Sequence, residues 1–121
     1  MFTIFNGLPE DILGVIISGK TTSTDYDQLN PLLEKHKEMH GTIKFLIEIE
    51  DLDYSADALW EDLRTGLHYW RYFNFVALVT DKKWLDTTIE TFATVIPGLK
   101  VKGFGLNERQ KAIAWLESQK K

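Results

Sequence analysis

Residues 43–49 read Ile-Lys-Phe-Leu-Ile-Glu-Ile, and residues 75–80 read Phe-Val-Ala-Leu-Val-Thr. Every second residue of the first segment is apolar, and the second segment is apolar almost throughout. Both patterns are typical of strands in a sheet. An amphipathic helical pattern at residues 55–70 separates them. A strand, a helix and a strand in this order form a parallel pair with a right-handed crossover. These segments therefore place the chain in the α/β class.

The rest of the chain continues this alternation. Further strands are predicted at residues 1–8, 12–18 and 99–104, and further helices at residues 24–41, 81–96 and 107–116. Because only a short turn joins the first two strands, we expect them to pair antiparallel. The predicted order is ββαβαβαβα. It describes one domain over residues 1–121, with a mixed, mostly parallel five-stranded sheet, its first strand antiparallel, and about four helices.

Local signals mark the ends of the first two helices. Thr24, with Asp27 three residues later, resembles a capping box. Pro31 either kinks the first helix or stands in the first turn of its main part. Gly41 is predicted to end this helix, and Ser55 to cap the next one.

Composition narrows the possible functions. The 121 residues are 44% hydrophobic and 26% charged, and 14 Lys and Arg against 18 Asp and Glu give a net charge of −4. This acidic balance argues against non-specific binding to nucleic acid or anionic lipid. The absence of cysteine excludes thiolate nucleophiles and disulfides. No apolar run has membrane-spanning length and no signal peptide is recognised, so we expect a cytoplasmic protein, with peripheral membrane association left open.

One stretch matches a phosphate-binding loop by its letters. Residues 14–21 read Gly-Val-Ile-Ile-Ser-Gly-Lys-Thr and satisfy the pattern G-x-x-x-x-G-K-[ST]. A phosphate-binding loop must turn sharply so that its backbone N–H groups surround the phosphates. The Val-Ile-Ile interior instead favours a strand, whose N–H groups are needed by the sheet. We therefore interpret this stretch as a strand followed by a turn.

Two polar groupings have simpler explanations than metal binding. His36 and His40 have the spacing of two ligands on one helix face, but no third ligand is evident, and an exposed or boundary helix face accounts for them. Acidic residues crowd between positions 48 and 62, at the end of a strand, and Asp81 follows the next strand. A magnesium or phospho-acceptor site is conceivable there. The preference of carboxylates for the first turn of a helix explains them more simply. We expect no metal, no cofactor and no catalytic site.

Several motifs, in order, resemble the SpoIIAA-like family of small bacterial proteins. They are Trp60-Glu61-Asp62-Leu63, Arg71-Tyr72-Phe73, the segment from Val76 to Leu85, and Ala112-x-x-Trp115-Leu116. The resemblance implies a STAS-like fold, close to anti-sigma-factor antagonists and related to CRAL-TRIO-type lipid-binding domains. It also implies helices that open and close over an apolar cavity, with membrane association. It agrees with the strand and helix order read from the residues.

The aromatic content of the predicted helices suggests where a ligand could bind. Most such residues belong to the core of a protein, and a cavity between the second and third helices, or an exposed patch, is the alternative. Our leading hypothesis is a non-enzymatic binding module for an apolar small molecule or lipid, or one that touches a membrane surface. The candidate ligand-binding residues are Trp60, Leu63, Leu67, Trp70, Phe73, Trp84, Phe92 and Ile96.

The alternative hypothesis is a phospho-switched protein-interaction module. Anti-sigma-factor antagonists are switched by phosphorylation of a serine at a helix start, and the resemblance makes Ser55 the nearest equivalent. A phosphate at a helix start is favoured electrostatically, although the neighbouring Asp53 and Asp57 oppose it. The simpler role of Ser55 is an N-cap. This reading implies a protein partner, and neither reading involves nucleic acid.

Overall fold

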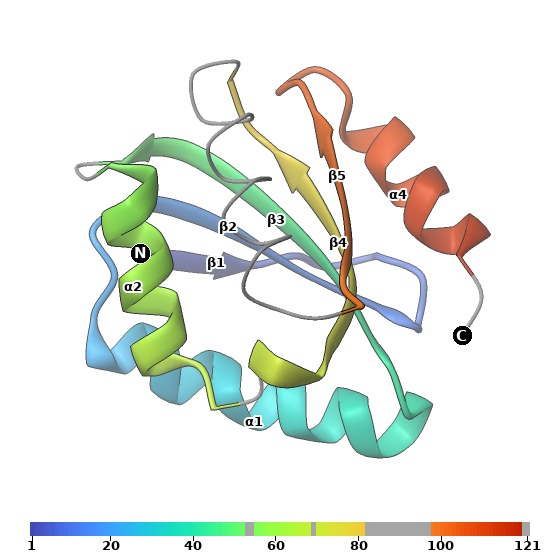
Figure 1. Cartoon of the computed structure of the whole chain (residues 1–121), viewed down its shortest axis with the longest axis horizontal. Helices are drawn as coiled ribbons and strands as arrows, with labels where there is room; N and C mark the ends of the chain where they lie inside the picture. The colour runs from blue at the N-terminus through green and yellow to red at the C-terminus, as the bar shows by residue number, and fades with distance from the viewer. Residues whose placement is uncertain (53–54, 69, 82–97, 120–121) are drawn as a thin grey trace.

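The computed structural model describes residues 1–52, 55–68, 70–81 and 98–119 (Figure 1). The strands are β1 (Phe2–Ile4), β2 (Ile12–Gly19), β3 (Ile43–Leu52), β4 (Phe73–Val79) and β5 (Lys100–Phe104). The helices are α1 (Ser23–His40), α2 (Ala56–Gly66) and α4 (Arg109–Ser118), with a short 3-10 helix, η1 (Trp70–Tyr72).

The five strands form one mixed sheet in the order β1-β2-β3-β4-β5. β1 pairs antiparallel with β2, with Thr3 opposite Ile16, and all later neighbours pair in parallel. The α/β class and the antiparallel first strand are therefore confirmed. About four helices were predicted, whereas the described residues contain three α-helices. Beyond Asp81, the helix predicted at residues 81–96 lies outside the described residues.

Alternation along the strands divides the core between the two faces of the sheet. Phe45 and Ile47 of β3 face the larger core, which contains the buried residues of α1 and α2. Leu46 faces the other core together with Ala112 and Leu116 of α4. Figure 1 shows α1 and α2 close together, with α4 apart from them beside β5. The sheet is thus covered on both faces, as a parallel sheet requires.

The first strand is shorter than predicted because the chain leaves the sheet to cover β2. β1 ends at Ile4, and Phe5 and Leu8 pack against the second core. A Cβ atom added at Gly14 would lie 2.7 Å from Leu8 Cδ1 and 2.9 Å from Phe5 Cδ2. Gly14 therefore gives this connection room to approach β2.

The stretch that resembles a phosphate-binding loop is a strand up to Gly19. β2 pairs with β3 along its length, for example Val15 with Ile47. Its N–H groups serve the sheet and do not form a phosphate cradle. The interpretation as a strand is confirmed, and residues 20–22 connect this strand to α1.

The capping box of α1 lies two residues earlier than predicted. The capping box joins Thr22 and Asp25, so the prediction of Thr24 with Asp27 was wrong. Pro31 lies inside one continuous helix and does not start its main part, and Gly41 ends the helix in the left-handed conformation, as predicted. Ser55 caps α2 through its side chain, which confirms that prediction.

Candidate functional site

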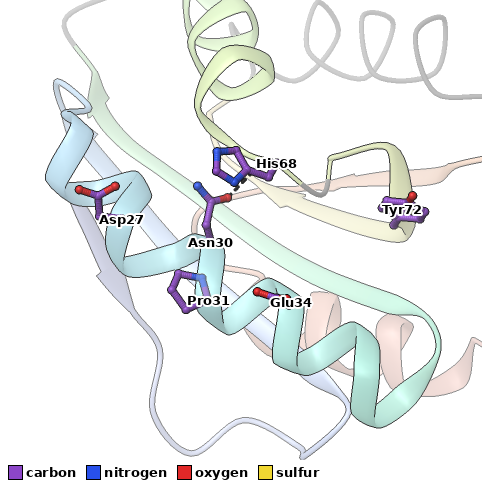
Figure 2. Close-up of a pocket in the computed structure, with 6 residues that line it drawn as sticks. All are labelled: Asp27, Asn30, Pro31, Glu34, His68 and Tyr72. Carbon is purple, nitrogen blue, oxygen red and sulfur yellow. Dashed lines mark hydrogen bonds between the residues drawn. The ribbon is translucent and has the colours of Figure 1, made fainter.

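A polar groove lies between α1 and the connection from α2 to β4 (Figure 2). It has a volume of about 550 Å³. Two acidic side chains and an exposed aromatic ring contribute to its lining. Its described lining is Asp27, Asn30, Pro31 and Glu34 from α1, and His68 and Tyr72 from the connection.

Asn30 builds this groove by fastening the connection to α1. Its amide Nδ2 donates to the carbonyl of Gly66 at 2.9 Å, and its Oδ1 accepts from the backbone N–H of His68 at 2.9 Å. Gly66 lies directly against the ring of Tyr26, where an added Cβ atom would come within 2.5 Å. Two segments distant in sequence are therefore held in contact at this point.

The charges of the groove suit a polar or cationic group better than an apolar one. Asp27 and Glu34 contribute carboxylates, and the Tyr72 side chain is 51% exposed. The Lys37 ammonium lies 4.4 Å from the centre of the Tyr72 ring, in a cation–π contact. This aromatic surface therefore already faces a cation.

A second pocket lies where β4 and β5 end. It has a volume of about 390 Å³, within the range of small-molecule sites, and more of its lining is apolar than polar. Phe104 is buried in it, and Leu106 is 49% exposed. The carboxyl ends of parallel strands are where open α/β sheets usually bind ligands. The described lining is Thr80, Asp81, Gly103, Phe104, Gly105, Leu106 and Glu108.

Hydrogen bonds fix the carboxylate of Glu108 at the rim of this pocket, which we call the β4–β5 pocket. The N–H of Gly105 donates to Glu108 Oε1 at 2.9 Å, and Lys111 Nζ contacts Oε2 at 3.2 Å. The Gly105 hydrogen bond, followed by that of Lys111, lowers the pKa of Glu108. The Glu108 carboxylate is therefore ionised at neutral pH and paired with the Lys111 ammonium.

Among the acidic residues of β3, Glu48 is held by an arginine. Arg109 at the start of α4 makes a two-point ion pair with Glu48. The hydrogen bond to Glu48 raises the pKa of Arg109. A hydrogen bond with Glu48, followed by burial, raises the pKa of Glu50. Across residues 1–52, 55–68, 70–81 and 98–119, no three His, Asp or Glu side chains converge as a metal site would need.

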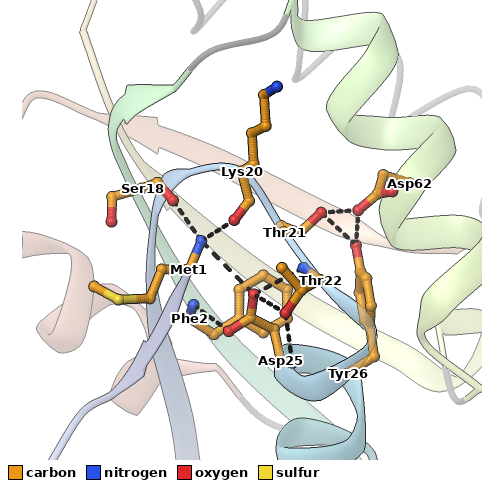
Figure 3. Close-up of polar contacts among 9 residues, drawn as sticks. All are labelled: Met1, Phe2, Ser18, Lys20, Thr21, Thr22, Asp25, Tyr26 and Asp62. Atoms are coloured by element: carbon orange, nitrogen blue, oxygen red, sulfur yellow. Dashed lines mark hydrogen bonds and ion pairs between the residues drawn. The ribbon is translucent and has the colours of Figure 1, made fainter.

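A cluster of hydroxyl and carboxyl groups joins the start of α1 to α2 (Figure 3). The hydroxyls of Thr21 and Tyr26 both donate to Asp62. Next to it, Asp25 accepts from the N–H groups of Phe2 at 2.9 Å and Thr22 at 2.8 Å. The Asp62 contacts join the start of α1 to α2, and the Asp25 contacts join it to β1.

Three of the residues predicted to bind a ligand lie in the larger core. Leu63, Leu67 and Phe73 are buried there. Trp60 lies on α2 and Trp70 begins η1. Trp84, Phe92 and Ile96 lie outside the described residues. The role of this set in binding stays a prediction, since the groove and the β4–β5 pocket have other described linings.

Sequence reasoning did not find the residues that line the two pockets, with one exception. Asp81 was noted because it follows a predicted parallel strand, and it does line the β4–β5 pocket. Phe104 and Leu106 carry no local signal of a site, because an apolar residue at a strand end looks like core. Asn30 and His68 are brought together only by the packing of α1 against the α2–β4 connection.

The described part of the chain has no helix long and apolar enough to cross a membrane.

Comparisons with a family model and with a solved structure agree on the fold family. A family model described as SpoIIAA-like matches residues 12–117. The chain is also similar to the crystal structure of an uncharacterised protein of the DUF3478 family, with a SpoIIAA-like fold, from Shewanella loihica PV-4. Identity is 30% over 96% of this chain and 92% of that chain, with a TM-score of 0.67. Among curated proteins, none matches significantly.

Proposed function

Because this chain belongs to the SpoIIAA-like family, we propose that it is a non-enzymatic, STAS-like binding module that holds an apolar small molecule in the β4–β5 pocket. The observation that carries the proposal is this pocket of about 390 Å³, whose lining is largely apolar with a few polar groups at its rim. This combination is typical of sites that bind small molecules.

The charges at the rim define the polar end of the ligand. Asp81 and Glu108 both line the pocket, and Glu108 is ionised at neutral pH. A carboxylate on the ligand would be repelled, whereas a hydroxyl or an ammonium group would be accepted. The ligand is therefore an apolar molecule with a neutral or cationic polar end.

Native mass spectrometry of protein purified without detergent tests for a ligand directly, beside a denatured control. We expect a non-covalent adduct that disappears on denaturation. Titration with 1-decanol, decylamine and decanoate then tests the charge argument, with decanoate expected to bind at least about tenfold more weakly, or about 1.4 kcal/mol. Equal binding of all three would show that the rim carboxylates do not select the ligand.

A pair of exposed side chains locates the site. Leu106→Ser should weaken the binding of 1-decanol, and Tyr72→Ser should leave it unchanged, because Tyr72 lines the groove and not this pocket. Both side chains are about half exposed, so both variants should fold. Weaker binding by Tyr72→Ser, with unchanged binding by Leu106→Ser, would place the binding site in the groove instead. If the wild type bound none of the three probes but bound phosphatidylcholine vesicles, the proposed ligand pocket would be wrong. The protein would then act at a membrane surface.

A second candidate function is a phospho-switched protein-interaction module, favoured by the position of Ser55. Its side chain is exposed at the start of α2, where its Oγ accepts from the N–H of Ala58 at 3.2 Å. A phosphate there would meet the positive end of the helix dipole. Identical partners recovered with wild type, Ser55→Ala and Ser55→Asp would exclude this switch. A partner lost only with Ser55→Asp would support it.

A further inference from the structure

His36 is a buried histidine with an unsatisfied nitrogen. It lies just before the last turn of α1 and is 8% exposed, more buried than the exposed or boundary position predicted from its spacing. Within the described part of the chain, its Nε2 is the one buried side-chain polar atom without a hydrogen-bond partner. A buried polar atom of this kind requires an explanation, because leaving it unpaired is destabilising.

His36 shares a pocket with two other potential metal ligands. Met39 and His40 follow at the spacing that places all three on one helix face. The three line the same pocket of about 240 Å³, far along the chain from the β4–β5 pocket. The ring centres of His36 and His40 are 4.7 Å apart. Metal–nitrogen bonds of about 2 Å would hold two imidazole nitrogens within about 4 Å, which rings at this separation can reach.

The donor types of this group select a soft metal ion. Two imidazoles and a thioether are ligands preferred by Cu(I), whereas magnesium and calcium require oxygen ligands. Structural zinc takes four ligands from Cys, His, Asp and Glu. Glu10 shares the pocket, but no three of His, Asp and Glu lie close enough together in the described residues to hold a metal ion, so the thioether is the third ligand. We propose that His36, Met39 and His40 form a Cu(I) site at the carboxyl end of α1.

The charges around this group also favour a cation. α1 ends at His40, so the three side chains stand at the negative end of the helix dipole. Glu10 lines the same pocket and adds a carboxylate, while Lys35 opposes a cation there. Asp11 attracts a cation in this pocket less strongly, because its carboxylate is already paired with the Lys44 ammonium at 3.1 Å. Burial, followed by the neighbouring His40, lowers the pKa of His36, which keeps its ring neutral and able to bind a metal.

Anaerobic titration with Cu(I), in competition with the coloured chelator bicinchoninate, measures this binding. We expect one equivalent bound by the wild type. Met39→Leu and His40→Gln should each weaken it at least tenfold. Met39 is 57% exposed and His40 is partly exposed, so both variants should fold, which thermal melting would verify. His68→Gln is the matched control, because it removes a histidine outside the pocket, and it should bind Cu(I) like the wild type.

A second readout locates the ion without a substitution. Cu(I) is diamagnetic, and the chain has two methionines, Met1 and Met39. The ε-methyl signal of Met39 should move on binding while that of Met1 stays in place. No binding by the wild type, equal loss in His68→Gln, or full affinity in Met39→Leu would each overturn the proposed site. Because the β4–β5 pocket is lined by other residues, none of these results bears on the proposed small-molecule function.

Discussion

Arg109 on α4 donates two hydrogen bonds to the buried carboxylate of Glu48 on β3, from Nε to Oε1 at 2.9 Å and from Nη2 to Oε2 at 2.7 Å. The Glu48 side chain is 1% exposed, and that of Arg109 is 43% exposed. The pair joins the start of α4 to the middle of the sheet. A carboxylate so deeply buried requires such a partner, because an ion taken out of water without one is strongly destabilising.

Removing the arginine should therefore destabilise the fold. We expect Arg109→Met to lower the free energy of unfolding by about 2–3 kcal/mol, somewhat less than a fully buried pair costs, because water can reach the vacated position. Urea unfolding of the variant measures this. The double variant Arg109→Met with Glu48→Gln should recover part of the loss, since no buried charge remains. A single variant within about 0.5 kcal/mol of the wild type would contradict this role.

Asp25 should make stability depend on acid pH. Burial raises the pKa of its carboxyl, but hydrogen bonds from the N–H groups of Phe2 and Thr22 and from the Thr22 hydroxyl outweigh burial and lower it. Its contribution is therefore fully present above the unfolded pKa of about 4 and is lost as pH falls through the folded value. Asp25→Asn should be less stable than the wild type at pH 7. The difference should shrink below about pH 4. Urea unfolding from pH 7 to pH 2.5 measures it, and a constant difference would contradict the linkage.

Gly66 should not tolerate a side chain. Its position would bring an added Cβ atom within 2.5–2.6 Å of three carbons of the Tyr26 ring, which is itself buried. Gly66→Ala should therefore cost about 1–3 kcal/mol by overpacking, although alanine is the better helix former. Thermal and urea unfolding measure the loss. Thr65→Ala, at the exposed neighbouring position, is the control and should change stability by less than about 0.5 kcal/mol. A stabilised Gly66→Ala would show that Tyr26 moves aside freely.

Ser55 should contribute to stability as a helix cap. Ser55→Ala removes the acceptor for the N–H of Ala58 and should lower stability by about 1 kcal/mol. Ser55→Asp should be nearly as stable as the wild type, because aspartate caps a helix as well as serine does. The two variants thus separate capping from charge. Equal stability of Ser55→Ala and wild type would mean that water replaces the cap.

Local patterns predicted much of the fold. The alternation in β3 and the apolar run of β4 identified the centre of the sheet, and Gly41 and Ser55 marked helix ends that the structure confirms. The capping box of α1 was misplaced because Asp25 is fixed by more than its own helix. It also accepts the N–H of Phe2 from β1, a contact that no rule based on neighbouring residues includes.

The candidate sites were much less predictable. The rule that ligands bind at the carboxyl ends of parallel strands drew attention to Asp81. The rule could not predict that Phe104 and Glu108 line the same pocket as Asp81. They do so because β5 pairs with β4. The spacing of His36 and His40 was visible, but the burial of His36 and its unpaired nitrogen were not.

Local patterns in the sequence predict the class of fold, the number of strands and their order along the chain, and the helix ends at Gly41 and Ser55, because periodicity and capping are properties of neighbouring residues. The ion pair of Glu48 with Arg109, the contact of Asn30 with His68 and the pocket at the ends of β4 and β5 arise from the packing of the whole chain. These contacts join residues far apart in the chain. They depend on which strands pair and on how the helices pack against the sheet, which no local pattern records.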